Sequence, residues 1–232
     1  MKKMNVIVTG ATGMVGEGVM HVCLNDDRID SVLALTRQPL GISHPKLKEI
    51  IHSNFYNLTG IEDQLTGYDA CFFCLGVSSV GLKESEYFKL THSLTLHVAG
   101  TLVRQNPGMT FCYVSGAGTD STERGRTMWA RVKGKTENDL MKQPFRQVFA
   151  FRPGFIKPIP GLKHAHKFYK YVLWMFPIGR AIAPNWFCTL EEVGNAMINV
   201  TLKGYVSPVI EGTDIVVLGQ AEPQMELAAV EQ

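Results

Sequence analysis

The chain has 232 residues, of which 45% are hydrophobic and 19% charged, and its formal net charge is +2. This length and composition allow one large domain with a sizeable hydrophobic core. The near-neutral charge and the absence of a basic run give no support to nucleic-acid binding. The five cysteines form no disulfide-like spacing, so we expect reduced, mostly buried thiols and a cytoplasmic location.

The N-terminal residues enter an apolar run directly, and we expect no secretory signal there. No apolar stretch approaches the roughly 20 residues that a membrane-spanning helix needs. The nearest is YVLWMFPIG at 171–179, which contains Pro177. We expect it to cover a substrate pocket or a subunit interface.

Short β-rich runs alternate with longer amphipathic stretches along the chain. Strands are expected at 5–10, 31–36, 48–53, 70–76, 110–116, 147–154 and 214–219. Helices are expected at 13–25, 85–105, 127–142 and 190–203. Most strand runs are continuously apolar, which is typical of strands covered on both faces. The alternation predicts a doubly wound parallel α/β sheet of the Rossmann type. We expect one domain over 1–232, with 156–186 as a small substrate-side cap.

The stretch VTGATGMVGEGV follows the first expected strand and opens the first expected helix. Glycine permits a tight turn and lets the backbone approach a pyrophosphate, while the helix N-terminus offers free N–H groups. The pattern therefore predicts a dinucleotide site, the alternative being a turn that only packs. The expected contacts are Gly10, Thr12, Gly13, Met14, Val15 and Gly16.

Further motifs follow in a familiar order: SVLALTR, FFCLGVS, YVSGAG, VKGKTEN and FRPGFI. Together with the glycine-rich turn they resemble the extended and atypical short-chain dehydrogenase/reductase families. Within these, the chain most resembles the NAD(P)H-binding, Tat-interacting-protein-like subgroup. The resemblance covers most of the chain and implies a nicotinamide cofactor, an oxidoreductase activity and a small-molecule substrate. Dimers are frequent in these families, so a homodimer is an open expectation.

The second expected strand ends in LALTRQP, where NAD-selective folds usually place Asp or Glu. Arg37 stands there instead and can hold a 2′-phosphate through charge-assisted hydrogen bonds. NADP(H) is therefore favoured over NAD(H), the alternative being that Arg37 is an ordinary surface residue. The resemblance implies further cofactor contacts at Asn54, Phe55, Leu75, Gly76, Val77, Pro153, Gly154, Phe155 and Ile156.

The resemblance also implies a catalytic site in which Ser115 orients the substrate oxygen and Lys133 binds the nicotinamide ribose. The proton-transferring tyrosine belongs four residues before the lysine, on the same helical face. This chain has Trp129 there. Indole offers one N–H donor and no accessible acid, and losing a general acid typically costs about 10² to 10⁴ in rate. Trp129 is expected either to stack on a ligand or to pack beneath the cap.

Two tyrosines are weighed as substitutes for the missing acid. Tyr113 is two residues from Ser115 and so shares its side of a regular strand, although such a tyrosine more often belongs to the core. Tyr87 follows the fourth strand, near where a substrate could sit. Lys133 and Glu137, four residues apart, are expected either to pair or to lie on a solvated helix face.

No metal site is predicted. His164 and His166 lie two residues apart, but no carboxylate or cysteine accompanies them at a ligand spacing. The basic stretch 163–170 favours a solvated helix face over contact with a membrane surface or an anionic substrate.

Two functional hypotheses follow. The favoured one is an NADP(H)-dependent oxidoreductase that acts on a small carbonyl or alcohol, organised by Ser115 and Lys133. The other is a non-catalytic protein that senses NADP(H) or acts as a scaffold, and Trp129 is its motivation.

Overall fold

A computed structural model describes residues 3–163 and 176–220. Its main sheet has seven parallel strands in the order β3-β2-β1-β4-β5-β6-β9. The strands are β1 (Met4–Thr9), β2 (Ile29–Thr36), β3 (Leu47–Ile51), β4 (Ala70–Phe73), β5 (Thr110–Val114), β6 (Gln147–Arg152) and β9 (Val209–Glu211). The chain order reverses between β1 and β4, which places the topological switch point at the carboxyl ends of these strands.

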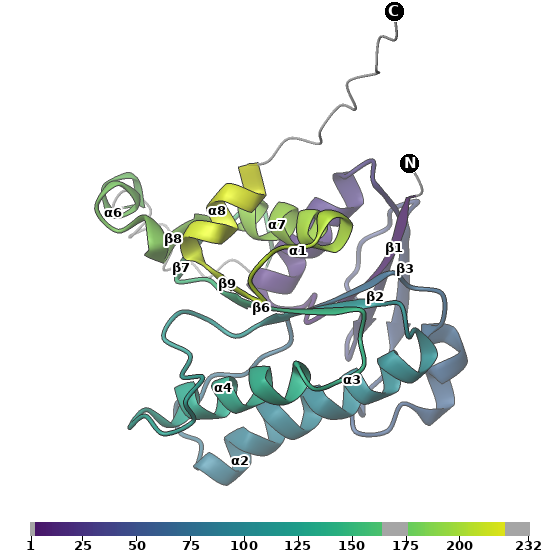
Figure 1. The fold of residues 1–232 in the computed structure, drawn as a ribbon. Coiled ribbons are helices and arrows are strands. Elements are labelled where there is room, and N and C mark those ends of the chain that lie inside the picture. The colour runs from purple at the N-terminus through teal and green to yellow at the C-terminus, as the bar shows by residue number, and fades with distance from the viewer. Residues whose placement is uncertain (1–2, 164–175, 221–232) are drawn as a thin grey trace, which may run out of the picture.

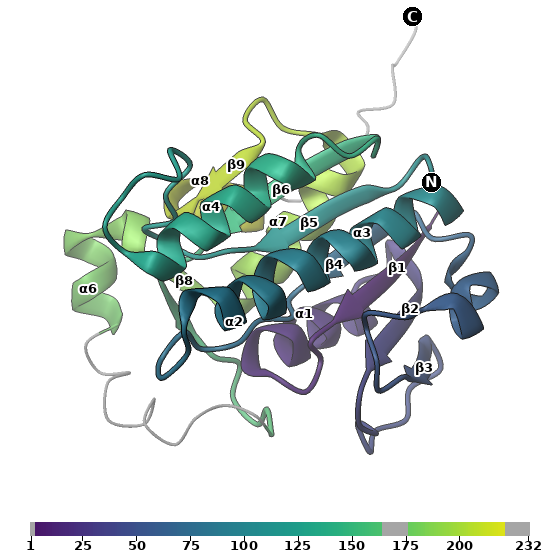
Figure 2. The same ribbon diagram turned by 90° about the horizontal axis from the view of Figure 1, so that it is seen from below.

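Helices cover both faces of the sheet (Figures 1 and 2). One face carries α1 (Met14–Asn25), α7 (Leu190–Lys203) and α8 (Gly212–Gln220). The other carries α2 (Glu84–Phe88), the π-helix η2 (Lys89–Ser93), α3 (Leu94–Gln105) and α4 (Met128–Leu140), while η1 (Thr59–Leu65) is a short 3-10 helix. The predicted doubly wound parallel sheet is confirmed. None of the helices in the described ranges has the length and apolarity to cross a bilayer.

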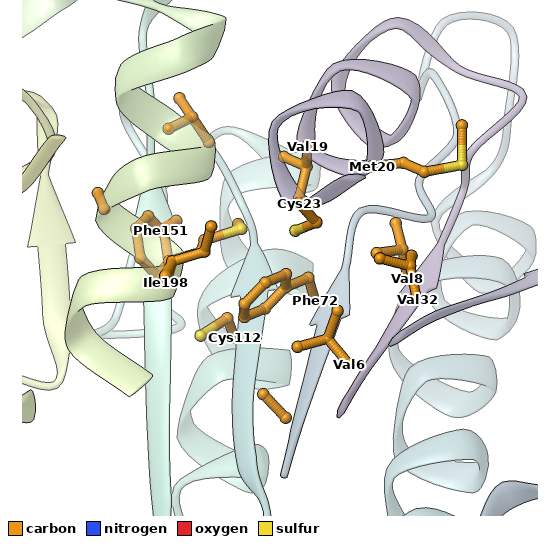
Figure 3. Close-up of a cluster of buried hydrophobic side chains, with 14 of the residues drawn as sticks. Val6, Val8, Val19, Met20, Cys23, Val32, Phe72, Cys112, Phe151 and Ile198 are labelled. Atoms are coloured by element: carbon orange, nitrogen blue, oxygen red, sulfur yellow. The ribbon is translucent and has the colours of Figure 1, made fainter. Parts of the chain in front are cut away.

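Buried apolar side chains form one layer on each face of the sheet. Figure 3 shows the layer beneath α1 and α7, where Val6 and Phe72 meet helix residues such as Cys23. Their strand neighbours Ile7 and Phe73 belong to the opposite layer, because successive strand residues point to opposite faces. Both faces of the central strands β1, β2, β4 and β5 are therefore largely buried, which accounts for the apolar runs in their sequences, whereas the edge strand β3 has no buried residue.

The helices α1 and α7 are in close contact through two glycines. A Cβ atom added at Gly18 would lie 2.0 Å from Cδ2 of Leu190, and one at Gly194 would lie 2.8 Å from Cβ of Val22. Leu190 of α7 thus packs against Gly18 of α1, and Val22 of α1 packs against Gly194 of α7. The sequence motif TLEE starts α7 with a reciprocal cap, in which Glu192 N donates to the Thr189 hydroxyl at 3.1 Å.

The last expected strand is wrong: residues 214–219 belong to α8, and the final strand is β9 instead. The β-branched run IVV favoured a strand, but tertiary packing decides otherwise. Ile215 is fully buried on the core side of α8, and Asn199 Nδ2 donates at 2.7 Å to the carbonyl oxygen of Leu218. Asp214 accepts from the backbone N–H of Glu211 at 3.1 Å, at the boundary between strand and helix.

The described part of the expected cap forms a small unit beyond β6. Strand β7 (Phe155–Lys157) pairs in parallel with β8 (Phe187–Thr189), and between them lie α6 (Phe176–Ile182) and η4 (Pro184–Trp186). The rings of Phe155, Phe176 and Phe187 have centroids 5.5–6.3 Å apart. His164, His166 and most of the basic stretch 163–170 lie outside the described residues.

Candidate functional site

The turn after β1 requires glycine at two positions. Gly10 has φ +73°, and a Cβ atom there would lie 2.7 Å from the carbonyl carbon of Cys74. A Cβ atom at Gly16 would lie 2.2 Å from the carbonyl oxygen of Gly10. Gly13 closes the turn by donating its N–H to that oxygen at 2.9 Å. These contacts bring the start of α1 directly onto the end of β4, as a pyrophosphate cradle needs.

The other residues expected to contact the cofactor from this turn differ in solvent exposure. Thr12 is exposed, whereas Met14 and Val15 are half-buried against the core beneath α1. The first turn of α1 therefore presents backbone N–H groups together with the Thr12 hydroxyl. A phosphate group fits this donor set, since the helix dipole adds favourable charge.

The loops after β2 and β3 carry the expected selectivity residues. Arg37 is exposed and has no hydrogen-bond or ion-pair partner within the described ranges. Asn54 is exposed, and its side-chain oxygen accepts from the backbone N–H of Tyr56 at 3.0 Å. The Phe55 side chain instead packs into the core with 3% exposure. Of the pair 54–55, only Asn54 presents its side chain to a ligand.

The loop after β4 lies against the glycine turn. Leu75 is half-buried, Gly76 is exposed, and Val77 is 39% exposed. Burial raises the pKa of the neighbouring Cys74 to about 12. Cys71 is fully buried, and both thiols are free. The CxxC pair thus packs within the strand and its end and lacks the exposure of a redox motif.

The loop after β5 and the helix α4 bring Ser115 and Lys133 together. The Lys133 ammonium group donates a hydrogen bond to the backbone carbonyl oxygen of Ser115. The Ser115 side chain is buried, and its hydroxyl donates to the Phe151 carbonyl oxygen at 3.1 Å. Burial lowers the pKa of Lys133, while the charge of Glu137 partly opposes this shift.

Trp129 faces the same loop from one turn earlier on α4. A Cβ atom added at Gly118 would lie 3.5 Å from Cη2 of the indole ring, and Gly118 has φ +83°. The Trp129 ring is half-buried, and its centre lies 6.0 Å from Nζ of Lys133. The tryptophan therefore occupies the expected position of the acid, with part of its ring accessible.

The bend after β6 forms the last part of the candidate site at the carboxyl ends of the strands. Ala117 N donates to the Pro153 carbonyl oxygen at 2.9 Å, so the loops after β5 and β6 lie side by side. A Cβ atom at Gly154 would lie 2.6 Å from the Trp186 carbonyl oxygen, which brings η4 onto the bend. Phe155 is half-buried, and Ile156 is 6% exposed in the core.

The proposed substitutes for the tyrosine are unsuited to proton transfer. Tyr113 is 2% exposed and lies in the core layer beside Phe73 and Phe111. Burial raises its pKa strongly, and the nearby Tyr87 and Glu137 add to the shift. Tyr87 is 1% exposed, and burial raises its pKa as well.

Glu137 is neither solvated nor paired with Lys133. It is 1% exposed, and Arg152 holds it with two hydrogen bonds, one of 3.0 Å to Oε1 and one to Oε2. Arg152 also donates at 3.1 Å to Glu211 on β9. The expected local pair fails because the buried guanidinium group is a better partner, offering a planar fork of donors.

Sequence reasoning overlooked Glu17. This side chain lies in the first turn of α1, is 9% exposed, and accepts a hydrogen bond from the backbone N–H of Lys163 at 2.8 Å. Nζ of Lys163 lies 3.5 Å from the carbonyl oxygens of both Leu40 and Gly41. The segment beyond β7 is thereby tied to the glycine-turn helix and to the loop after β2. A charged residue at an otherwise apolar helix start was the available signal.

Comparison with sequences finds distant relatives. No protein-family model matches the chain. Protein FMP52, mitochondrial, of Eremothecium gossypii is 27% identical over 155 residues, covering 66% of this chain and 66% of that protein. Protein FMP52, mitochondrial, of Candida albicans is 23% identical over 215 residues, covering 91% and 84%. The match thus spans just under two thirds of the first relative.

The names of these relatives indicate a cellular location. Both are named mitochondrial proteins, and so is the FMP52 protein of Kluyveromyces lactis. The expected cytoplasmic location rested on the reduced state inferred for the cysteines, which does not distinguish these compartments. The comparison points to mitochondria, so the cytoplasmic prediction is wrong.

Comparison with solved structures establishes the fold. A short chain dehydrogenase family protein from Francisella tularensis has a TM-score of 0.64 at 15% identity, covering 89% of this chain and 95% of that one. L-sorbose reductase from Gluconobacter frateurii, complexed with NADPH and L-sorbose, has 0.63 at 12%, covering 90% and 94%. The Bordetella bronchiseptica enzyme WbmF, in complex with NAD⁺, has 0.63 at 16%, covering 93% and 77%.

Proposed function

We propose that the protein is a nicotinamide-dependent oxidoreductase of the atypical short-chain dehydrogenase/reductase type. One observation carries the proposal: the turn at Gly10 and Gly16 leaves no room for side chains and lies at the switch point of the sheet. The solved structures with the same fold include complexes with NADPH and with NAD⁺. The Tat-interacting-protein-like subgroup, the single domain with its cap, a homodimer and a mitochondrial location belong to the same proposal.

The residues at the carboxyl ends of the strands could bind a dinucleotide in one orientation. The N-terminus of α1 would bind the pyrophosphate, and Arg37 would bind a ribose 2′-phosphate, which favours NADP(H). An ammonium group has three donors, and Lys133 commits one of them to Ser115 among the described residues. The other two are available for the nicotinamide ribose. Bound reduced nicotinamide would supply a hydride to a small carbonyl substrate.

The first test is a calorimetric titration with NADPH and, separately, with NADH. We expect tight NADPH binding and weak NADH binding. Binding of neither cofactor would contradict the proposal, and a preference for NADH would remove Arg37 from it. A panel of carbonyl substrates with NADPH follows. We expect Lys133→Ala to lose turnover, whereas Lys142→Ala, whose side chain is 72% exposed, should retain it.

A second candidate function is a non-catalytic sensor of NADP(H). Trp129 favours it, together with the burial of Tyr113 and Tyr87, because neither tyrosine can replace the missing acid. A sensor would bind NADPH without turnover and would change its oligomeric state or a partner interaction on binding. Size-exclusion profiles that are identical with and without NADPH, and no partner in a pull-down, would count against it.

A further inference from the structure

In the part of the chain that the structure describes, the candidate active site brings Lys133 and Trp129 to the loop after β5 without an acidic side chain bonded to them. Within the described ranges, no Tyr, His, Asp or Glu side chain hydrogen-bonds to residues 115–118, to Trp129 or to Lys133. The Ser115 hydroxyl already donates to a backbone carbonyl oxygen. Lys133 is the cation of the site, since its ammonium group reaches the loop after β5.

An acid-free site restricts the chemistry of the acceptor. Hydride addition to an isolated ketone yields an alkoxide, whose conjugate acid has a pKa near that of water, about 15.7. Such an alkoxide would take its proton from Lys133 and would neutralise the group proposed to hold the ribose. A phenolate has a conjugate acid with a pKa of about 10. Because it is a much weaker base than the alkoxide, it can form without proton transfer in the same step, so its formation needs no general acid.

We propose that the substrates are planar conjugated dicarbonyls, the quinones, rather than isolated ketones. This inference rests on the proposed function and names the substrate class of the same site. Trp129 is half-buried, and the edge of its ring lies next to Gly118. A conjugated ring could stack on the accessible part of the indole. At the adjoining bend, the backbone of Trp186 lies against Gly154, and this residue is 55% exposed.

The reaction balances without a protein acid. Reduced nicotinamide, when bound, would supply a hydride from its C4–H bond, and this hydride with its electron pair would add to one carbonyl oxygen of the quinone. The quinone ring would become aromatic, its second oxygen would become a phenolate, and the nicotinamide would be left oxidised. One proton from water then completes the hydroquinone. Lys133 stabilises the phenolate by its charge, and Trp129 takes no part in proton transfer.

The test compares two bicyclic probes of similar size, 1,4-naphthoquinone and 1-tetralone. After subtraction of the rate without protein, we expect kcat/KM for the quinone to exceed that for the ketone by about 10² or more, the usual contribution of a general acid. Trp129→Tyr should raise ketone reduction by a similar factor, because it restores a side-chain acid. Trp129→Phe offers a smaller ring without a hydroxyl group, so it should raise KM for the quinone and gain nothing with the ketone. Equal rates for the two probes in the unaltered protein would overturn the inference.

Binding gives a readout that is independent of turnover. Naphthoquinone should quench tryptophan fluorescence saturably, and Trp129→Phe should lose most of the saturable part. Unchanged quenching in that variant would overturn the stacking role. If Trp129→Tyr fails to fold, as judged by circular dichroism, Trp129→Phe and the two probes still decide the question. NADPH binding without quinone turnover contradicts this inference alone, whereas absence of NADPH binding contradicts the proposed function.

Discussion

Nζ of Lys133 lies 6.0 Å from the centre of the Trp129 ring, on the same face of α4. This distance is at the limit of a cation–π contact, which an ammonium group makes and a neutral amine does not. The position that a tyrosine would occupy is therefore coupled to the lysine through an aromatic face rather than through an acid.

We expect the emission of Trp129 to report the titration of Lys133. Burial lowers the pKa of this lysine, so the change should occur below the usual lysine value of about 10.4. A fluorescence titration from pH 7 to 11 would measure it. Lys133→Met and Trp129→Phe should both abolish the transition. A transition that persists in Lys133→Met would show that another group is responsible.

The Gly16→Ala substitution should damage the turn. The new Cβ atom would lie 2.2 Å from the Gly10 carbonyl oxygen, which is backbone and cannot yield without moving the turn. We expect a loss of about 1–3 kcal/mol in the free energy of unfolding, typical of overpacking, and a loss of NADPH binding. Gly60→Ala is the matched control, since nothing lies within 4 Å of its added Cβ atom. Chemical denaturation and calorimetry measure both effects, and equal behaviour of the two variants would contradict the contact.

Replacement of Arg37 should separate the two cofactors. A charge-assisted hydrogen bond contributes about 1.5–3 kcal/mol, so Arg37→Ala should weaken NADPH binding roughly 10- to 100-fold and barely change NADH binding. Lys3→Ala removes another exposed cation, at the opposite end of the sheet, and serves as the control. A parallel loss for both cofactors would place Arg37 outside the 2′-phosphate site.

Glu137→Gln should destabilise the fold strongly. The Arg152 and Glu137 side chains are 11% and 2% exposed, so the change removes the buried carboxylate and leaves the guanidinium group only the 51% exposed Glu211 as a charged partner. Breaking such a pair from one side costs about 3–5 kcal/mol. In the exposed pair of Arg131 with Glu84, the side chains are 24% and 54% exposed, and Glu84→Gln should cost under about 1 kcal/mol. Urea denaturation of the two variants measures this difference. Equal losses in the free energy of unfolding would contradict the prediction.

Asp139 should contribute to acid sensitivity. Burial alone would raise its pKa, but hydrogen bonds from Lys142, His92 and Lys135 outweigh burial and hold the pKa well below its usual range. Because the folded pKa is the lower one, the stabilisation is present above the unfolded value of about 3.9 and is lost as the pH falls through the folded value. The stability difference from Asp139→Asn should be widest above about pH 5 and should shrink below pH 4. A difference that does not change with pH would contradict this.

The sheet could be predicted from sequence because its signals are local. Most of the first six strands are short apolar runs, although β3 carries Lys48 and Glu49, and the glycine spacing after β1 indicates the turn directly. The run Ile215 to Leu218 was wrongly predicted as a strand, because its β-branched residues favour a strand locally. Its helical conformation is stabilised by packing against α7 and β9. The partner of Glu137 was equally inaccessible, since Arg152 is distant in sequence and reaches it only after β6 has joined the sheet.

For the candidate site, the sequence predicted which positions contribute but not how deeply their side chains are buried. Ser115 and Lys133 are assigned by the resemblance and Trp129 by its spacing from Lys133, and the structure brings all three to the loop after β5. The burial of Phe55 and Tyr113 could not be read from spacing, because it depends on which face of the sheet each side chain meets. Glu17 stands out in the sequence as a charge at an apolar helix start, but its contact with the backbone of Lys163 could not be predicted from the sequence.

The reciprocal glycine contacts between α1 and α7 have a thermodynamic consequence. Leu190 at Gly18 and Val22 at Gly194 fix the rotation and height of α1 against the core. The N–H groups at its N-terminus are therefore oriented before a nucleotide arrives, and binding need not order them. Such preorganisation reduces the conformational entropy lost on association. Amide hydrogen exchange along α1 should accordingly be slow in the free protein and should change little when the nucleotide binds.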